Sequence, residues 1–198
     1  LFEARSAFVY SAKHAAVPVE ETRTSLGLRR DRKTALVALS SRDEMFAADV
    51  VGRFSAPIDG SFTFPTQLDW LKHVVGIAAR RTDLQFVVRV HPREFPNKRE
   101  GVMSPNVARL NEVLSDLPDN VIVDWPTDGR GIYDVLQVCD VVLSGWSSVG
   151  AESALLGLPV VVYDTGELLG YPTDLVAVVD ATEDYERVVD QAIARGVS

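Results

Sequence analysis

The residue types best suited to chemistry cluster in one short stretch, Ser147-Ser148-Val149-Gly150-Ala151-Glu152. Ser147 or Ser148 is a suitable N-cap for a helix that would run to Leu156. The start of such a helix presents free backbone N–H groups and the positive end of the helix dipole. Two hydroxyls stand beside these groups, and Gly150 keeps side chains out of the way. The stretch therefore predicts an anion site, most naturally for phosphate.

Glu152 needs a different explanation. It lies four residues after Ser148, on the same helix face one turn in, whereas a capping box requires Glu three residues after the cap. A carboxylate there does not suit phosphate but suits a pair of sugar or ribose hydroxyls. An ordinary capped helix packing Ala151 and Ala154 against a sheet would explain the serines alone. The combination Ser-Ser-x-Gly-x-Glu between two buried strands favours a ligand site.

His91 is the second candidate for phosphate binding. Its imidazole can donate to a phosphate oxygen, and Pro92 fixes the turn that presents it. Arg89 points to the same side of the expected strand and would be costly in a buried sheet unless paired. A histidine bonded to a loop is the ordinary alternative, but the anion-ready helix on the same edge favours a functional role. His14 and His73 have no comparable setting, so no metal site is expected.

Alternating strands and helices must position these residues. Strands are expected at 34–39, 84–90, 121–123, 140–143, 160–162 and 175–179, as near-continuous apolar runs. Helices are expected at 65–78, 104–117, 132–138, 148–156 and 183–194, with 40–44 a polar loop and 45–66 a long loop with room for a short helix. This alternation predicts an α/β fold with a doubly wound parallel sheet and helices on both faces.

In such sheets ligands bind at the carboxyl ends of the strands. The unusual residues of the chain follow strand ends: Ser40, Ser41, His91, Trp125, 144–148 and 163–164. The glycine-rich dinucleotide fingerprint and the G-x-x-x-x-G-K-[ST] phosphate loop are both absent from the sequence. A nucleophile elbow is also missing, because the run 145–149 lacks the second glycine of G-x-S-x-G, so hydrolase chemistry is disfavoured.

Composition sets the broad class. The chain has 198 residues, of which 46% are hydrophobic, which is enough for one sizeable core. The net charge of −8 argues against a nucleic-acid partner, and the short basic cluster at 29–33 reads as a solvated linker. Cys139 is the only cysteine and is expected in the core, which excludes a disulfide framework. No apolar run reaches transmembrane length and no signal peptide is visible.

Three segments together carry a family resemblance. The runs 64–71 (FPTQLDWL), 87–94 (VVRVHPRE) and 147–160, which contains SSVGAE and LGLPV, resemble bacterial capsular polysaccharide biosynthesis proteins. Those proteins resemble glycosyltransferases of the two-Rossmann-domain type called GT-B. The similarity runs over roughly 34–172 and covers the C-terminal, donor-binding half. Related arrangements occur in UDP-N-acetylglucosamine 2-epimerases and in glycerophosphate polymerases.

The resemblance implies roles for particular residues. The His-Pro pair is similar to the motif with which bacterial sialyltransferases and Kdo transferases hold the phosphate of a CMP-sugar. By that likeness His91 and Ser147 or Ser148 contact donor phosphate, and Glu152 holds hydroxyls of the nucleotide or sugar. Further donor-binding candidates at the same edge are Arg89, Ser40, Ser41 and Trp125. No Asp-x-Asp motif is visible, so neither a metal nor another cofactor is expected.

The resemblance also implies partners and a place in the cell. The partners are a nucleotide-sugar donor and a glycan or glycolipid acceptor. The location is the cytoplasm, including the inner face of the cytoplasmic membrane, with peripheral association through the rest of the protein. We expect 1–33 to be a lead-in or interdomain segment and 34–198 a Rossmann-like nucleotide-sugar-binding domain.

The sequence departs from such enzymes at its N-terminus. An acceptor-binding domain, which usually brings the catalytic base, would precede the donor half, and 33 residues are too few for one. The chain also starts at Leu1, so we expect a fragment that binds donor without turning it over. No catalytic residue can be named, and Asp43 and Glu44 are the only carboxylates near the right edge. A nucleotide-sugar epimerase, for which acidic pairs would be expected, and a non-catalytic nucleotide-binding module are the alternatives.

Overall fold

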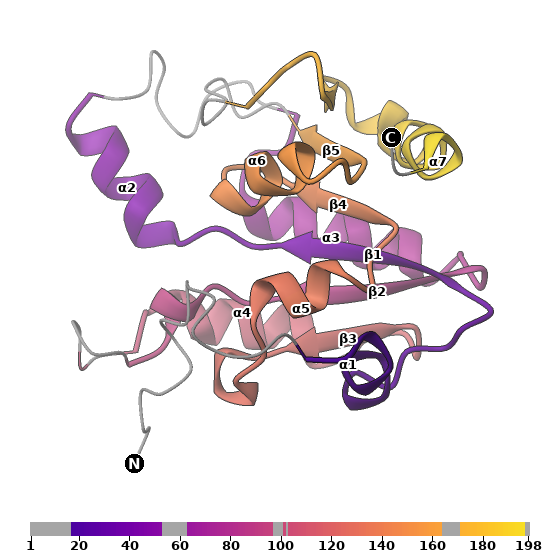
Figure 1. Cartoon of the computed structure of the whole chain (residues 1–198). Coiled ribbons are helices and arrows are strands. Elements are labelled where there is room, and N and C mark those ends of the chain that lie inside the picture. The colour runs from indigo at the N-terminus through magenta and orange to yellow at the C-terminus, as the bar shows by residue number, and fades with distance from the viewer. Residues whose placement is uncertain (1–16, 53–62, 97–100, 102, 164–170, 197–198) are drawn as a thin grey trace.

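The fold is built on one sheet of six parallel strands in the order β3-β2-β1-β4-β5-β6 (Figure 1). The computed structural model describes residues 17–52, 63–96, 101, 103–163 and 171–196. The strands are β1 (Lys33–Ala38), β2 (Leu84–Arg89), β3 (Val121–Asp124), β4 (Val141–Ser144), β5 (Val160–Tyr163) and β6 (Val176–Val179). Each lies within one or two residues of its expected position, and the doubly wound parallel sheet is confirmed.

Helices cover both faces of this sheet. They are α1 (Val19–Ser25), α2 (Arg42–Val50), α3 (Gln67–Ala78), α4 (Asn106–Leu114), α5 (Ile132–Leu136), α6 (Ser148–Leu155) and α7 (Tyr185–Arg195). Short 3-10 helices, η1 (Pro92–Glu94), η2 (Pro126–Asp128) and η3 (Thr182–Asp184), follow β2 and β3 and precede α7. Helices α3, α4 and α7 share one buried apolar cluster with the sheet, and α5, α6 and the segment after α1 share the other. None of the helices in the described part of the chain is long and apolar enough to cross a membrane.

Helix α2 corrects the expected loop after the first strand. The segment 42–50 is helical, so Asp43 and Glu44 belong to its first turn. Ser41 caps this helix by accepting a hydrogen bond from the backbone N–H of Glu44 at 3.3 Å. The expected loop at 45–66 left room for a short helix, but the pattern did not show that a helix starts at Arg42, because no residue of α2 is buried and Phe46 is 63% exposed. Residues 53–62 of the expected long loop lie outside the described part.

The segment before the first strand is integrated into the fold. Helix α1 contacts α5, and the two leucines that follow α1, Leu26 and Leu28, are buried in the cluster with α5 and α6. The segment before β1 is therefore packed onto the sheet from Val19 onward, and residues 1–16 lie outside the described part.

Cys139 is a core residue, as expected, and burial raises the pKa of its thiol to about 12.

Strand register brings one set of residues to the carboxyl edge. Ala38 of β1 is paired with Arg89 of β2 and with Ser144 of β4, and Arg89 is in turn paired with Asp124 of β3. The strands therefore end in line, and the segments that follow them begin side by side. Neighbouring strands are about 4.8 Å apart, so two strand spacings, about 10 Å, separate β2 from β4.

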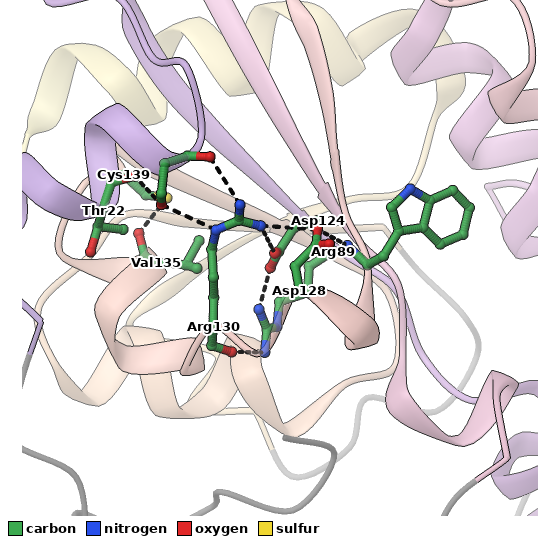
Figure 2. Close-up of polar contacts among 9 residues, drawn as sticks. Thr22, Arg89, Asp124, Asp128, Arg130, Val135 and Cys139 are labelled. Carbon is green, nitrogen blue, oxygen red and sulfur yellow. Dashed lines mark hydrogen bonds and ion pairs between the residues drawn. The ribbon is translucent and has the colours of Figure 1, made fainter. Parts of the chain in front are cut away.

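Arg89 is paired, as its position in a buried sheet requires. Its guanidinium and that of Arg130 contact opposite oxygens of the Asp124 carboxylate, which is fully buried (Figure 2). Arg130 lies 2.8 Å from Asp124, and it also donates to the backbone oxygen of Ser25 at 2.9 Å. This cluster joins β2, β3 and the end of α1 into one unit.

The buried ion cluster predicts a large effect for Asp124→Ala. Two guanidinium groups would lose the carboxylate that balances them, which costs about 3–5 kcal/mol of unfolding free energy for a buried pair. Asp128→Ala removes a more exposed partner of Arg130 at 3.0 Å and the acceptor of the Trp125 backbone N–H, and should cost about 0.5–2 kcal/mol. Urea unfolding followed by circular dichroism measures both values. Equal losses in the two variants would contradict the role assigned to Asp124.

Candidate functional site

The candidate site lies where the strand order reverses. From β1 the chain fills the sheet outward through β2 and β3, and it then returns to β4 on the other side of β1. In open parallel sheets this switch point leaves a crevice at the carboxyl ends of the two central strands. The segments that border it here are the β1–α2 turn and the β4–α6 turn, with the β2–η1 turn next to them.

The β1–α2 turn is held by its own serines. The Ser40 hydroxyl donates to the backbone oxygen of Trp146, which joins the end of β1 to the turn after β4. The side-chain amide of Gln67 brackets Ser40, accepting from its N–H at 2.6 Å and donating to its oxygen at 3.1 Å. Ser41 caps α2. Both serines are nearly fully buried, and their hydroxyls hold the turns at this edge of the sheet. Contact of these serines with the nucleotide-sugar donor stays a prediction.

The β4–α6 turn is organised around Tyr171. Its phenol donates to the backbone oxygen of Ser147 at 2.6 Å, accepts from the Ser147 N–H at 3.1 Å and lies 3.0 Å from the Ser144 hydroxyl. Burial raises the pKa of Tyr171, so the phenol keeps the proton that it donates. A Cβ at Gly150 would lie 2.6 Å from the Tyr171 ring, and one at Gly145 would overlap the Tyr163 ring. Both glycines therefore also make room for aromatic rings.

Helix α6 begins after Ser147, in agreement with the expected cap position. The Ser147 side chain makes no cap bond to this helix within the described residues. Because Ser147 N–H is bound to Tyr171 and Gly150 N–H to the Ser147 oxygen, the first-turn donors that remain without a partner in the described part are those of Ser148 and Val149.

Glu152 lies one turn into α6 and contacts α5. Its Oε2 accepts a hydrogen bond from the hydroxyl of Tyr133 at 2.8 Å. Tyr133 is 46% exposed, and its hydrogen bond to the carboxylate raises its pKa. The pair thus connects α5 and α6 at the solvent-facing side of the sheet edge.

A group of charged residues surrounds His91. The Nδ1 atom of His91 accepts from the backbone N–H of Arg93 at 3.2 Å, so the proton of the neutral imidazole lies on Nε2. This Nε2 is 3.9 Å from the carboxylate of Glu44, which also contacts the Arg93 guanidinium at 3.1 Å. Burial lowers the pKa of His91, while Glu44 opposes this shift and the two nearby arginines, Arg93 and Arg89, add to it.

Two other predicted residues lie in structural contacts. The Arg89 guanidinium is held by Asp124, and the Trp125 ring packs edge-on against Phe95 with ring centroids 5.8 Å apart. The backbone N–H of Trp125 donates to the Asp128 carboxylate at 3.1 Å. The structure thus brings Ser40, Ser41, His91, Ser147 and Ser148 to neighbouring turns, places Glu152 one turn behind them, and gives Arg89 and Trp125 contacts of their own.

Sequence reasoning missed several residues of this edge. Arg93 stands two positions after His91 inside a motif already singled out, so a cation beside the candidate phosphate ligand could have been noticed. Tyr171, Tyr133 and Gln67 act through contacts distant in sequence, for which the pattern carries no signal. Within the described residues no group of three or more His, Cys, Asp or Glu side chains could hold a metal ion.

No protein-family model and no curated protein sequence matches the chain. Solved structures match its fold. UDP-GlcNAc 2-epimerase from Neisseria meningitidis bound to UDP-GlcNAc has a TM-score of 0.51 at 15% identity, over 89% of this chain and 39% of that one. Spinosyn rhamnosyltransferase SpnG has a TM-score of 0.50 at 18% identity, over 84% and 37%. E. coli ADP-heptose lps heptosyltransferase II has a TM-score of 0.54 at 9% identity, over 89% and 51%.

These structural likenesses establish the fold, and the fold alone. The chain has the Rossmann-like fold found in GT-B glycosyltransferases and UDP-GlcNAc 2-epimerases. It spans between 37% and 51% of the length of these three structures.

The role of Tyr171 predicts a loss of stability for Tyr171→Phe. The change leaves the Ser147 N–H and the Ser144 hydroxyl buried without their partner, which costs about 1–3 kcal/mol of unfolding free energy. The matched control is Tyr133→Phe, whose hydroxyl is exposed and bonds Glu152 alone, so it should cost less than about 1 kcal/mol. Chemical denaturation gives both values, and a neutral Tyr171→Phe would show that this phenol does not hold the turn.

The lowered pKa of His91 predicts how stability depends on pH. The folded state keeps the imidazole neutral, whereas the unfolded chain takes up a proton below pH about 6.5. The contribution of His91 to the free energy of unfolding should therefore be complete above pH about 6.5. It should fall as the pH drops below this value, until the pKa of His91 in the folded state is passed. His73, whose pKa burial also lowers, contributes in the same direction.

The measurement compares unfolding of the parent and His91→Gln at pH 7.5 and 5.5. The variant should lose less stability over this interval because one of the two contributing imidazoles is gone. A variant with the same pH dependence as the parent would mean that His91 is not held neutral.

Proposed function

We propose that this chain is the donor-binding part of a glycosyltransferase and that it binds a nucleotide-sugar at the carboxyl edge of its sheet. The observation that carries the proposal is the convergence at the switch point of the β1–α2, β4–α6 and β2–η1 turns. Ser40 joins the first two through its bond to Trp146, and Glu44 joins the first to the third. The shared fold of nucleotide-sugar enzymes supports the same edge.

The phosphate of the nucleotide-sugar fits between two groups of hydrogen-bond donors. The N–H groups of Ser148 and Val149 at the start of α6 have no partner in the described part of the chain, and the helix dipole favours an anion there. On the other side of β1, the Nε2–H of His91 supplies a side-chain donor that is only partly buried. With the two strand spacings between them, these groups suit a phosphate-containing ligand that lies across the end of β1.

The ribose or sugar hydroxyls of the ligand fit beside Glu152, one turn into α6. Glu152 has one carboxylate oxygen on Tyr133, and its second oxygen can accept from a hydroxyl. The acidic chain, with a net charge of −8, gives no support to a nucleic-acid partner. We propose a small donor ligand whose diol reaches Glu152.

The finer assignment follows the sequence resemblance. The His-Pro pair at 91–92 favours a CMP-sugar, and the three resembling segments favour transfer to a capsular or other surface polysaccharide. The chain spans 37% to 51% of the length of its three structural neighbours, so we propose that the acceptor side and the catalytic base come from a further domain.

A second candidate is an enzyme of the UDP-sugar 2-epimerase kind. The specific observation in its favour is the fold likeness to UDP-GlcNAc 2-epimerase, which is as high as that to the rhamnosyltransferase SpnG. The two candidates differ in the nucleotide that they need. A preference for UDP and UDP-GlcNAc over CMP would favour the epimerase kind.

The test is calorimetric titration of the chain with CMP, CDP, UDP and GDP. We expect micromolar-to-millimolar binding of CMP that His91→Ala weakens about 10- to 100-fold, because a hydrogen bond to a charged phosphate is lost. The control is His73→Ala, which should leave the affinity unchanged because His73 lies on α3 and its ring packs against Phe64. Undiminished affinity in His91→Ala would refute the phosphate role, and no binding of any nucleotide would refute the proposed function.

A further inference from the structure

Helix α2 is attached to the sheet edge through polar and charged residues. None of its residues is buried, and Phe46 and Val50 are 63% and 67% exposed. Its first turn is held by the Ser41 cap, by the N–H of Arg42 on Glu94 at 3.3 Å, and by the Glu44 carboxylate. Apolar packing therefore contributes little to its position, and its charged contacts contribute most.

The two groups that contact Glu44, a guanidinium and an imidazole, are of the kinds that bind phosphate. Oε1 lies 3.1 Å from the guanidinium of Arg93 and Oε2 lies 3.9 Å from Nε2 of His91. Because Nδ1 of His91 accepts from the backbone N–H of Arg93, the proton of the neutral imidazole lies on Nε2, the nitrogen nearer to this carboxylate. A guanidinium beside an imidazole N–H binds phosphate oxygens by the same charge-assisted hydrogen bonds.

We propose that Glu44 is an internal stand-in for the donor phosphate. Its carboxylate occupies the His91–Arg93 pair when no donor is bound, and a phosphate group replaces it and releases the first turn of α2. Arg93 thereby becomes a phosphate-binding residue beside His91. The inference rests on the proposed function, since it needs a phosphate at His91.

The exposure and charge of these groups favour an exchange. The Glu44 side chain is 42% exposed, whereas those of Arg93 and His91 are 29% and 18% exposed, so the carboxylate is the part free to leave. A phosphate carries more charge and more acceptor oxygens than a carboxylate, so it competes well for one guanidinium.

Glu94 makes double occupancy unfavourable. It is 2% exposed, and its Oε2 has no hydrogen-bond partner in the described part of the chain. Its Oε1 accepts from the N–H of Arg42, which places this second carboxylate under the start of α2. With Glu94 buried nearby, phosphate and Glu44 together would place too much negative charge around Arg93. The two anions should therefore exclude each other.

The experiment measures CMP and inorganic phosphate binding by calorimetry in the parent and in Glu44→Gln. Removing the competing charge should tighten CMP binding about five- to tenfold. Asp49→Asn removes the same charge from the last turn of α2 and should change affinity less than about twofold. Arg93→Gln should weaken binding about tenfold or more, and Glu44→Gln should bring no gain when Arg93→Gln is also present.

A second measurement needs no variant. Hydrogen exchange of the α2 amides should become faster in the parent when CMP is added, because the contact that holds the first turn is lost. Three outcomes would show that Glu44 is not a stand-in while leaving the proposed function intact, provided that the parent binds CMP. Glu44→Gln could bind CMP equally or more weakly than the parent, or Asp49→Asn could give the same gain in affinity. Hydrogen exchange in α2 could also stay unchanged or become slower on binding. If neither parent nor Glu44→Gln binds CMP or phosphate, both the stand-in and the proposed function are wrong.

Discussion

All six strands run parallel, and this one constraint places every candidate residue. Because each strand ends at the same edge, Ala38, Arg89 and Ser144 stand in line, and the turns that follow them must share the space beyond. The reversal of strand order between β1 and β4 leaves that space open at the centre of the sheet. A hydrogen bond from the Ser40 hydroxyl to the backbone oxygen of Trp146 joins the turns that follow these two central strands.

The fold could be predicted from sequence because its signals are local. Apolar runs bounded by polar turns located all six strands, and the glycine and proline after α6 marked its end; Gly157 indeed has a positive φ of 82°. For helix α2 the sequence left room for a short helix but did not locate it, because the helix buries no side chain and its sequence carries no apolar stripe. The contact between α1 and α5 was equally invisible, since it depends on a pairing of segments more than 100 residues apart.

The site could be predicted only in part. His91 and the run 147–152 lie at the carboxyl edge of the sheet, where the expected strand positions had placed them, because strand ends follow from strand positions. What each side chain does there depends on partners brought in by the fold. Ser41 is occupied by its own helix, Arg89 by Asp124, and Tyr171 reaches the β4–α6 turn from a loop with no helical or strand pattern. Electrostatic roles such as that of Glu44 depend on such pairings and need the structure.

The central claim is that the carboxyl edge of the sheet binds a nucleotide phosphate. Its most direct test is a two-dimensional amide NMR titration of the ¹⁵N-labelled chain with CMP. The account predicts saturating shifts at Ser148 and Val149, at the turn after β2 and in the first turn of α2, with α3, α4 and α7 unaffected. Shifts confined to the amino-terminal edge of the strands, or to the α3 and α4 helices, would contradict it.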